Sequence, residues 1–110
     1  MKLSSLKYKN QPVHTDEGYF ASQAEHRRWC LLKLRQRAGE IEGLKRQVTY
    51  QLNVNGFHIC DYIADATYTE IKPAPGFVVE DAKGVETKDF KIKAKLFEAI
   101  FGFKIRVVRT

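Results

Sequence analysis

The chain has 110 residues, enough for one domain with a single modest core. Hydrophobic residues make up 44% and charged residues 29%, an ordinary globular balance, and no apolar run approaches the roughly 20 residues of a membrane-spanning helix. Nineteen Lys and Arg oppose thirteen Asp and Glu, giving a net charge of +6. This excess favours a polyanionic partner such as nucleic acid, although a solvated basic surface would have the same composition.

The first twenty residues are polar and basic. We expect residues 1–20 to form an N-terminal arm that orders only against the domain or its ligand, and residues 21–110 to form the single domain. Residues 1–10 lack the apolar core of a secretion signal, so the expected location is the cytoplasm, with no membrane partner.

A first helix is predicted from Ser22 to Gly39. Ser22 and Glu25 have the spacing of a capping box, and Gly39 is a typical C-terminal stop. The segment from Glu40 to Arg46 is expected to be a short connection.

Three strands are predicted next. Apolar and polar residues alternate over 48–54, and Asn55-Gly56 is the strongest short signal for a hairpin turn. The return strand is predicted over 57–68, and a compact apolar strand over 77–83.

A second helix is predicted from Thr87 or Lys88 to Gly102, because apolar residues recur there at spacings of three and four. A last short strand is expected over 105–108. The helix also carries a set of lysines, which form either a solvated face or a surface that follows phosphates: Lys88, Lys91, Lys93 and Lys95. The order helix, three strands, helix, strand predicts an α/β fold with a mixed central sheet flanked by helices.

Three polar residues interrupt or close the predicted apolar strands: Asp65, Asp81 and Lys83. Strand side chains alternate between faces, so Asp81 and Lys83 point the same way, and Asp65 can meet them if its strand is a neighbour. Two carboxylates suffice for Mg²⁺, which keeps several waters, and a nearby lysine can orient an attacking water or stabilise developing charge. The alternative is a solvated strand end, and for Glu25 the local pattern favours a capping role with Ser22 over a ligand role.

The chain resembles the PD-(D/E)XK nuclease superfamily and, more narrowly, a phage and prophage family of small proteins known as a domain of unknown function. The matching segments lie within residues 7–108 and are 18–25, 44–47, 62–65, 78–84 and 87–93. The element order also matches the αβββαβ core of the superfamily, a restriction-endonuclease-like fold.

This resemblance assigns roles to individual residues. Asp65 and Asp81 correspond to the two acids of the motif and Lys83 to its lysine, while Glu25 corresponds to a helix acid that assists the metal. Gln47 matches a polar position that would support the metal ligands from behind. Ala64 stands where the motif's name has proline, and Glu80 is an alternative second acid that alternation places on the face opposite Lys83.

The resemblance implies a Mg²⁺- or Mn²⁺-dependent deoxyribonuclease, an endonuclease that hydrolyses DNA phosphodiesters in phage recombination, replication or DNA processing. Branched DNA is an expected substrate, the lysines of the second helix would bind DNA, and the host cytoplasm is the expected location. Junction-cutting relatives often act as homodimers, although this sequence does not indicate which face would form the dimer. The competing class is a non-catalytic DNA-binding or interaction module that retains the fold.

Overall fold

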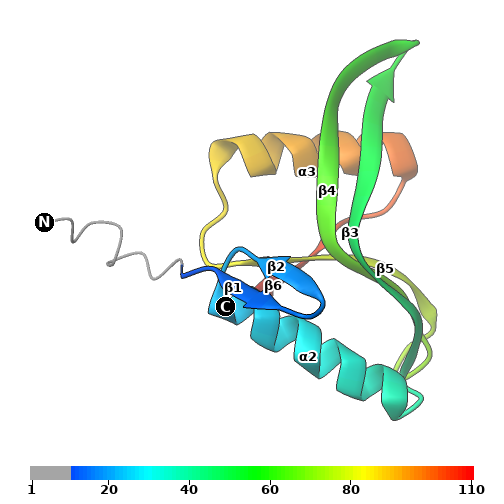
Figure 1. The fold of residues 1–110 in the computed structure, drawn as a ribbon. Helices are drawn as coiled ribbons and strands as arrows, with labels where there is room; N and C mark the ends of the chain where they lie inside the picture. Colours follow the sequence, from blue (N-terminus) through cyan, green and yellow to red (C-terminus); the bar gives the residue numbers. More distant parts are fainter. Residues whose placement is uncertain (1–10) are drawn as a thin grey trace, which may run out of the picture.

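The structure, a computed structural model, describes residues 11–110, so the part of the predicted N-terminal arm at residues 1–10 lies outside it. Its main body is a four-stranded sheet in the order β3-β4-β5-β6 with helices α2 and α3, and a small hairpin, β1-β2, precedes α2 (Figure 1). The elements are β1 Val13–Thr15, β2 Gly18–Phe20, α2 Gln23–Arg37, β3 Ile41–Val54, β4 Phe57–Glu70, β5 Gly76–Lys83, α3 Lys88–Phe101 and β6 Arg106–Arg109.

The predicted order of helix, three strands, helix and strand is confirmed from α2 onward. The sheet is mixed, because β3, β4 and β5 pair antiparallel while β6 returns parallel to β5. The parallel return requires a crossover, which α3 provides. Among the described residues, no helix is both long and apolar enough to cross a bilayer.

The local signals for helix and turn boundaries are confirmed. Ser22 and Thr87 cap α2 and α3, each accepting a hydrogen bond from the backbone N–H three residues on. Gly102 ends α3 at a φ of 85°, which glycine adopts without steric cost. Asn55 and Gly56, both at positive φ, form the tight turn between β3 and β4.

Two stretches of chain are more ordered than expected. The segment 40–46 was predicted as a connection, but this was wrong, because β3 begins at Ile41 and Ile41 pairs with Glu70. Ile41 is buried, and this burial outweighs the interruption of the ladder near Gly43, whose φ is 67°. Within the segment assigned to the basic arm, residues 13–20 form the hairpin β1-β2, which leads directly into α2.

A bend divides the long β3-β4 hairpin into two parts (Figure 1). Gln47, at a φ of 53°, lies opposite Asp65 in the register, between the pairs Arg46↔Ala66 and Val48↔Ala64. A non-glycine residue at positive φ is uncommon within a strand and turns the chain locally. The bend therefore coincides with the position that carries the predicted acid of β4.

The hydrophobic core changes sides at this bend. Ala66, on the α2 side of the bend, belongs to a cluster with Leu32 of α2. Ala64, two residues away, belongs to a second cluster with Phe97 of α3. Asp65 is therefore located where the core under α2 gives way to the core under α3.

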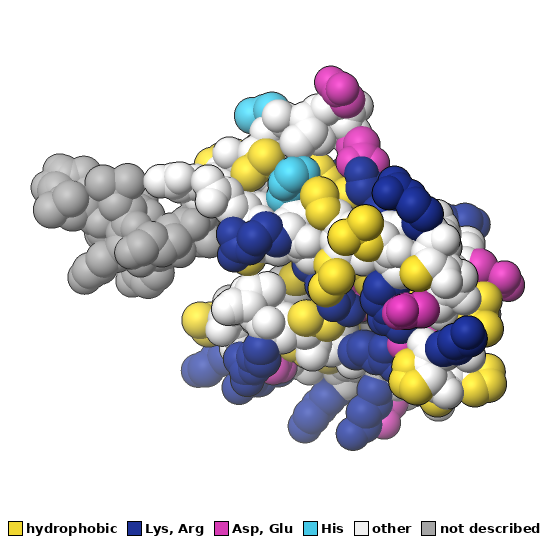
Figure 2. Space-filling model, turned by 90° about the horizontal axis from the view of Figure 1, so that it is seen from below, with side chains coloured by type: hydrophobic (Ala, Val, Ile, Leu, Met, Phe, Trp, Pro, Cys, Tyr) yellow, Lys and Arg dark blue, Asp and Glu magenta, His cyan; other side chains and the backbone are white. Residues whose placement is uncertain are grey.

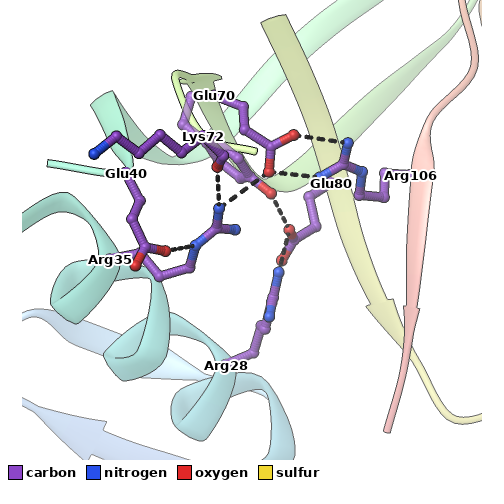
Figure 3. A network of polar contacts seen from close by, with 8 residues as sticks. Arg28, Arg35, Glu40, Glu70, Lys72, Glu80 and Arg106 are labelled. Carbon is purple, nitrogen blue, oxygen red and sulfur yellow. Dashed lines mark hydrogen bonds and ion pairs between the residues drawn. The ribbon is translucent and has the colours of Figure 1, made fainter. Parts of the chain in front are cut away.

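A buried ionic network anchors α2 to the sheet (Figure 3). Arg28 of α2 donates two hydrogen bonds to Glu80 of β5, at 2.7 and 2.9 Å, and the Tyr68 hydroxyl donates a third to Glu80 at 2.6 Å. Nearby, Glu70 accepts hydrogen bonds from Arg35 and Arg106. Glu80 thus faces α2 and is neutralised there, so it serves to hold α2, and with it Glu25, at a fixed place on β5.

Candidate functional site

The carboxylate of Asp65 lies where β4 separates from β5. The last pair between these strands is Ala66↔Glu80, and one step further the backbone N–H of Ala82 donates to Asp65 Oδ2 at 2.8 Å. The side chain of Asp65 therefore replaces the backbone acceptor that β4 would have offered. This hydrogen bond fixes the carboxylate directly beside β5.

Asp81 is buried on the α3 side of β5, two residues from Lys83 on the same face. Its Oδ2 accepts a hydrogen bond from the Tyr62 hydroxyl, and its Oδ1 lies 3.3 Å from Lys83 Nζ. Lys83 Nζ also lies 4.7 Å from the centre of the Phe90 ring, a cation–π contact. The pairing of Asp81 with Lys83 that strand alternation predicted is present.

Asp81 is close enough to Asp65 to affect the ionisation of the Asp65 carboxyl. Burial, followed by the charge of Asp81, raises the pKa of Asp65 to about 7, although the N–H of Ala82 opposes this. Two carboxylates held together with partial burial favour either a shared proton or a bound cation. Burial also raises the pKa of Tyr62, so its phenol stays protonated and donates to Asp81.

Glu25 and Gln47 approach this pair from the side. Ser22 accepts the backbone N–H of Glu25 at 3.1 Å, which confirms the N-cap and leaves the Glu25 carboxylate for other contacts. That carboxylate lies 3.8 Å from the Arg46 guanidinium and accepts a long, 3.5 Å hydrogen bond from the Gln47 amide. Burial raises the pKa of Glu25, Arg46 lowers it and Asp81 raises it, and the charge of Glu25 in turn raises the pKa of Asp65.

The side chains of Glu25, Asp65, Asp81 and Lys83 line a groove of about 870 Å³ between the N-terminal ends of α2 and α3. The groove is lined by the residues of the acidic pair, by Lys83 and Glu25, by the N-cap residues of both helices and by the segment after β5. They are Ala21, Ser22, Gln23, Ala24, Glu25, Arg27, Asp65, Asp81, Ala82, Lys83, Gly84, Val85, Thr87 and Thr110.

The donor set fits a hard divalent cation held by two carboxylates. Within residues 11–110, no group of three or more His, Cys, Asp and Glu side chains is arranged to hold a metal ion, so Glu25 does not complete a three-ligand cage. Mg²⁺ usually binds through one or two carboxylates and keeps waters or substrate phosphates in its other positions. Asp65 and Asp81 provide that number of ligands beside an open groove, and a ligand role for Glu25 stays a prediction.

The predicted DNA-binding lysines lie on α3, whose N-terminal end borders the groove. Lys88, Lys91 and Lys95 are exposed at helical spacings of three and four, whereas Lys93 is partly buried. Among residues 11–110, none of these four lysines forms an ion pair. Basic side chains are also widespread on another face, the one seen from below in Figure 2.

Sequence reasoning did not single out three residues of this site. Arg27 is exposed and lines the groove, one helical position away from the partly buried Arg28. Tyr62 binds Asp81, and Arg46 contacts both Glu25 and the ring of Phe20. Arg46 and Tyr62 lie within the segments 44–47 and 62–65 that carry the family resemblance, and Arg27 lies two residues after a candidate acid in a helix that begins at the site.

The position of Gln47 gives a first prediction. Gln47→Gly is expected to fold with a free energy of unfolding within about 1 kcal/mol of the wild type, because glycine accepts the positive φ. Gln47→Val is expected to lose roughly 1 to 3 kcal/mol, since a β-branched side chain resists that conformation. Urea unfolding followed by circular dichroism measures both, and equal stability of the two variants would contradict a requirement for positive φ.

The mixed four-stranded sheet with its two helices is compatible with a restriction-endonuclease-like αβ core, with the acids and the lysine on adjacent strands. The family described as "Protein of unknown function (DUF1064)" matches residues 5–109, and the chain belongs to this family. Neither the curated proteins nor the solved structures gave a match to this chain.

Proposed function

We propose that this protein is a metal-dependent DNA endonuclease of the PD-(D/E)XK type. The observation that carries the proposal is the pairing of Asp65 and Asp81 beside Lys83 on an open groove. Two carboxylates and one ammonium group at this spacing suit phosphodiester hydrolysis, in which negative charge develops on the phosphate oxygens. The groove is open, Arg27 and Lys83 line it beside the acids, and the helix that begins at it carries exposed lysines, which suits a polymer better than a small metabolite.

Asp65 and Asp81 would hold Mg²⁺ or Mn²⁺, which supplies polarisation of the phosphate and a lower pKa for bound water. Lys83 would orient the attacking water or bind the phosphate, since its ammonium is a compact charge that is about a third exposed. Tyr62 keeps Asp81 in place by donating to its Oδ2. Glu25 would add negative charge from α2, and Gln47 would position Glu25.

DNA would be held by the exposed lysines of α3 and by Arg27. Arg27 lies in the wall of the groove, and the lysines lie on the helix that begins at the groove. Contacts of this kind neutralise phosphates without reading sequence, so affinity would depend strongly on salt. The charge pattern supports backbone recognition, with branched DNA of a phage recombination or replication intermediate as the substrate we expect.

The triple variant Lys88→Ala, Lys91→Ala, Lys95→Ala is expected to bind DNA at least about tenfold more weakly at 0.1 M salt. The slope of log affinity against log salt should become shallower by about 2 to 3, since each lost phosphate contact contributes about 0.9. Fluorescence anisotropy with a labelled duplex measures both quantities. Lys104→Ala, beyond the C-terminal end of α3, is the matched control, and an equal loss in both proteins would contradict a specific role for this face.

A cleavage panel tests the proposed activity. The protein is incubated with linear, nicked, single-stranded and four-way DNA, with Mg²⁺, with Mn²⁺ and with a chelator. We expect cutting of at least one substrate with metal and none with the chelator. If a folded preparation cuts none of them, and Asp81→Asn binds DNA as the wild type does, the chain is a non-catalytic DNA-binding module.

A further inference from the structure

The β3-β4 hairpin extends beyond the bend as a two-stranded projection past α3 (Figure 1). We call residues 48–63 the distal hairpin. One of its faces packs on α3, where Tyr50 and Tyr62 contact the ring of Phe97. No helix within residues 11–110 covers the other face, and large apolar side chains are exposed there and near the tip: Phe57 at 72%, Ile59 at 55% and Ile63 at 52%.

The distal hairpin contains very few charged residues. Every one of the nineteen Lys and Arg residues lies outside residues 47–71. The only acid of the distal hairpin, Asp61, is 3.2 Å from His58. A surface that binds DNA needs cations to neutralise phosphates, so this projection is unsuited to DNA. Its exposed apolar side chains suit contact with protein.

The outer edge of the distal hairpin also lacks the usual protection. β3 is an edge strand of the sheet, so one row of its backbone N–H and C=O groups is unpaired within the sheet. Near α2, this strand carries the charged residues Glu42, Lys45 and Arg46, and its pairing register is irregular. Both features hinder the addition of another strand. From Val48 to Val54 it contains no charged residue and no proline, and its register is irregular only between Leu52 and Asn53, where the extra residue, Ile59, lies on β4.

We propose that two copies of this chain associate through their distal hairpins, by antiparallel pairing of the 48–54 edges. An antiparallel pair of identical strands is self-complementary, as a two-fold interface requires. Two copies that each carry +6 repel unless they meet where positive charge is absent, and at cellular salt only charges within about 8 Å of the contact matter. The segment without Lys and Arg meets this condition.

The contact is small, which sets its expected strength. Seven residues of strand span roughly 24 Å, and a face about 15 Å wide on each copy buries less than about 1,000 Å² in total. Interfaces of this size are weak and transient, so the expected dissociation constant is in the micromolar range. This inference does not depend on the proposed nuclease activity.

Sedimentation equilibrium of the full chain from about 5 to 500 μM, without DNA or metal, tests the proposal. The wild type is expected to approach twice the 12.7 kDa of one chain as concentration rises. Gln51→Lys places a charge on the open edge and Ile63→Glu places one on the exposed apolar face, so each is expected to raise the dissociation constant at least about tenfold. Leu34→Glu is the matched control, since Leu34 on α2 is 55% exposed and should tolerate the charge.

A charge exchange separates loss of association from loss of folding. Gln51→Lys and Gln51→Glu should each associate at least about tenfold more weakly alone, and an equimolar mixture should regain association because the new charges attract. A monomeric wild type throughout the concentration range would overturn the proposal, and so would unchanged association in both Gln51 variants. A monomeric wild type whose DNA affinity falls with Ile63→Glu would instead assign the distal hairpin to DNA.

Discussion

Asp81→Asn is expected to lower the rate of DNA cleavage by about a thousandfold or more while leaving DNA binding within about twofold of the wild type. Asp81 is buried and can bind a cation only as a carboxylate, whereas the amide carries no charge. The amide oxygen still accepts a hydrogen bond, so the Tyr62 hydroxyl keeps a partner and the fold should persist. Single-turnover cleavage in Mn²⁺ and anisotropy in Ca²⁺ separate chemistry from binding.

Asp61→Asn provides the matched control for this experiment. Asp61 lies on the same strand as Asp65 but is about half exposed, and its carboxylate contacts His58. It should cleave DNA at the wild-type rate. Equal activity in Asp81→Asn, Asp61→Asn and the wild type would show that the acidic pair takes no part in the reaction.

Asp65→Asn is expected to stabilise the metal-free protein at pH 8 by roughly 2 to 4 kcal/mol, while abolishing its response to metal. The folded-state pKa of Asp65 is raised to about 7 from 3.8. The folded protein therefore keeps a proton that the unfolded chain releases, and the free energy of unfolding falls as pH rises from about 4 to about 7. Asparagine removes the repulsion with Asp81 and still accepts the N–H of Ala82.

Thermal unfolding at pH 5 and pH 8, with and without Mn²⁺, measures this effect. The wild type should lose stability between the two pH values and regain it with Mn²⁺ at pH 8, because a ligand that binds the folded state stabilises it. Asp65→Asn should show neither change. If Asp65→Asn were less stable than the wild type at pH 8 without metal, this would contradict a destabilising repulsion between Asp65 and Asp81.

The features that sequence predicted well are those set by neighbours in the chain. Ser22, Thr87 and Gly102 each act on backbone groups within three or four residues, so their roles follow from spacing alone. The pairing of Asp81 with Lys83 follows from strand alternation in the same way. Asp16 and Glu17 form the turn of the first hairpin, whereas the polar and basic composition of residues 1–20 predicted an arm.

The features that sequence did not predict depend on contacts between distant segments. Gln47 has no propensity for a positive φ, and its conformation follows from the two cores that meet at Asp65. Tyr62 reaches Asp81 across nineteen residues because the bend brings its part of β4 over α3. Spacing alone favoured a capping role for Glu25, and its contacts with Arg46 and Gln47 depend on the fold.

The metal site that we propose at Asp65 and Asp81 is tested most directly by counting bound Mn²⁺ with electron paramagnetic resonance at pH 8. The wild type is expected to bind Mn²⁺ saturably, while Asp65→Asn and Asp81→Asn lose this binding and Asp61→Asn retains it. Mn²⁺ that remains bound to both site variants, or no saturable binding by the folded wild type with DNA present, would contradict a metal site at this pair.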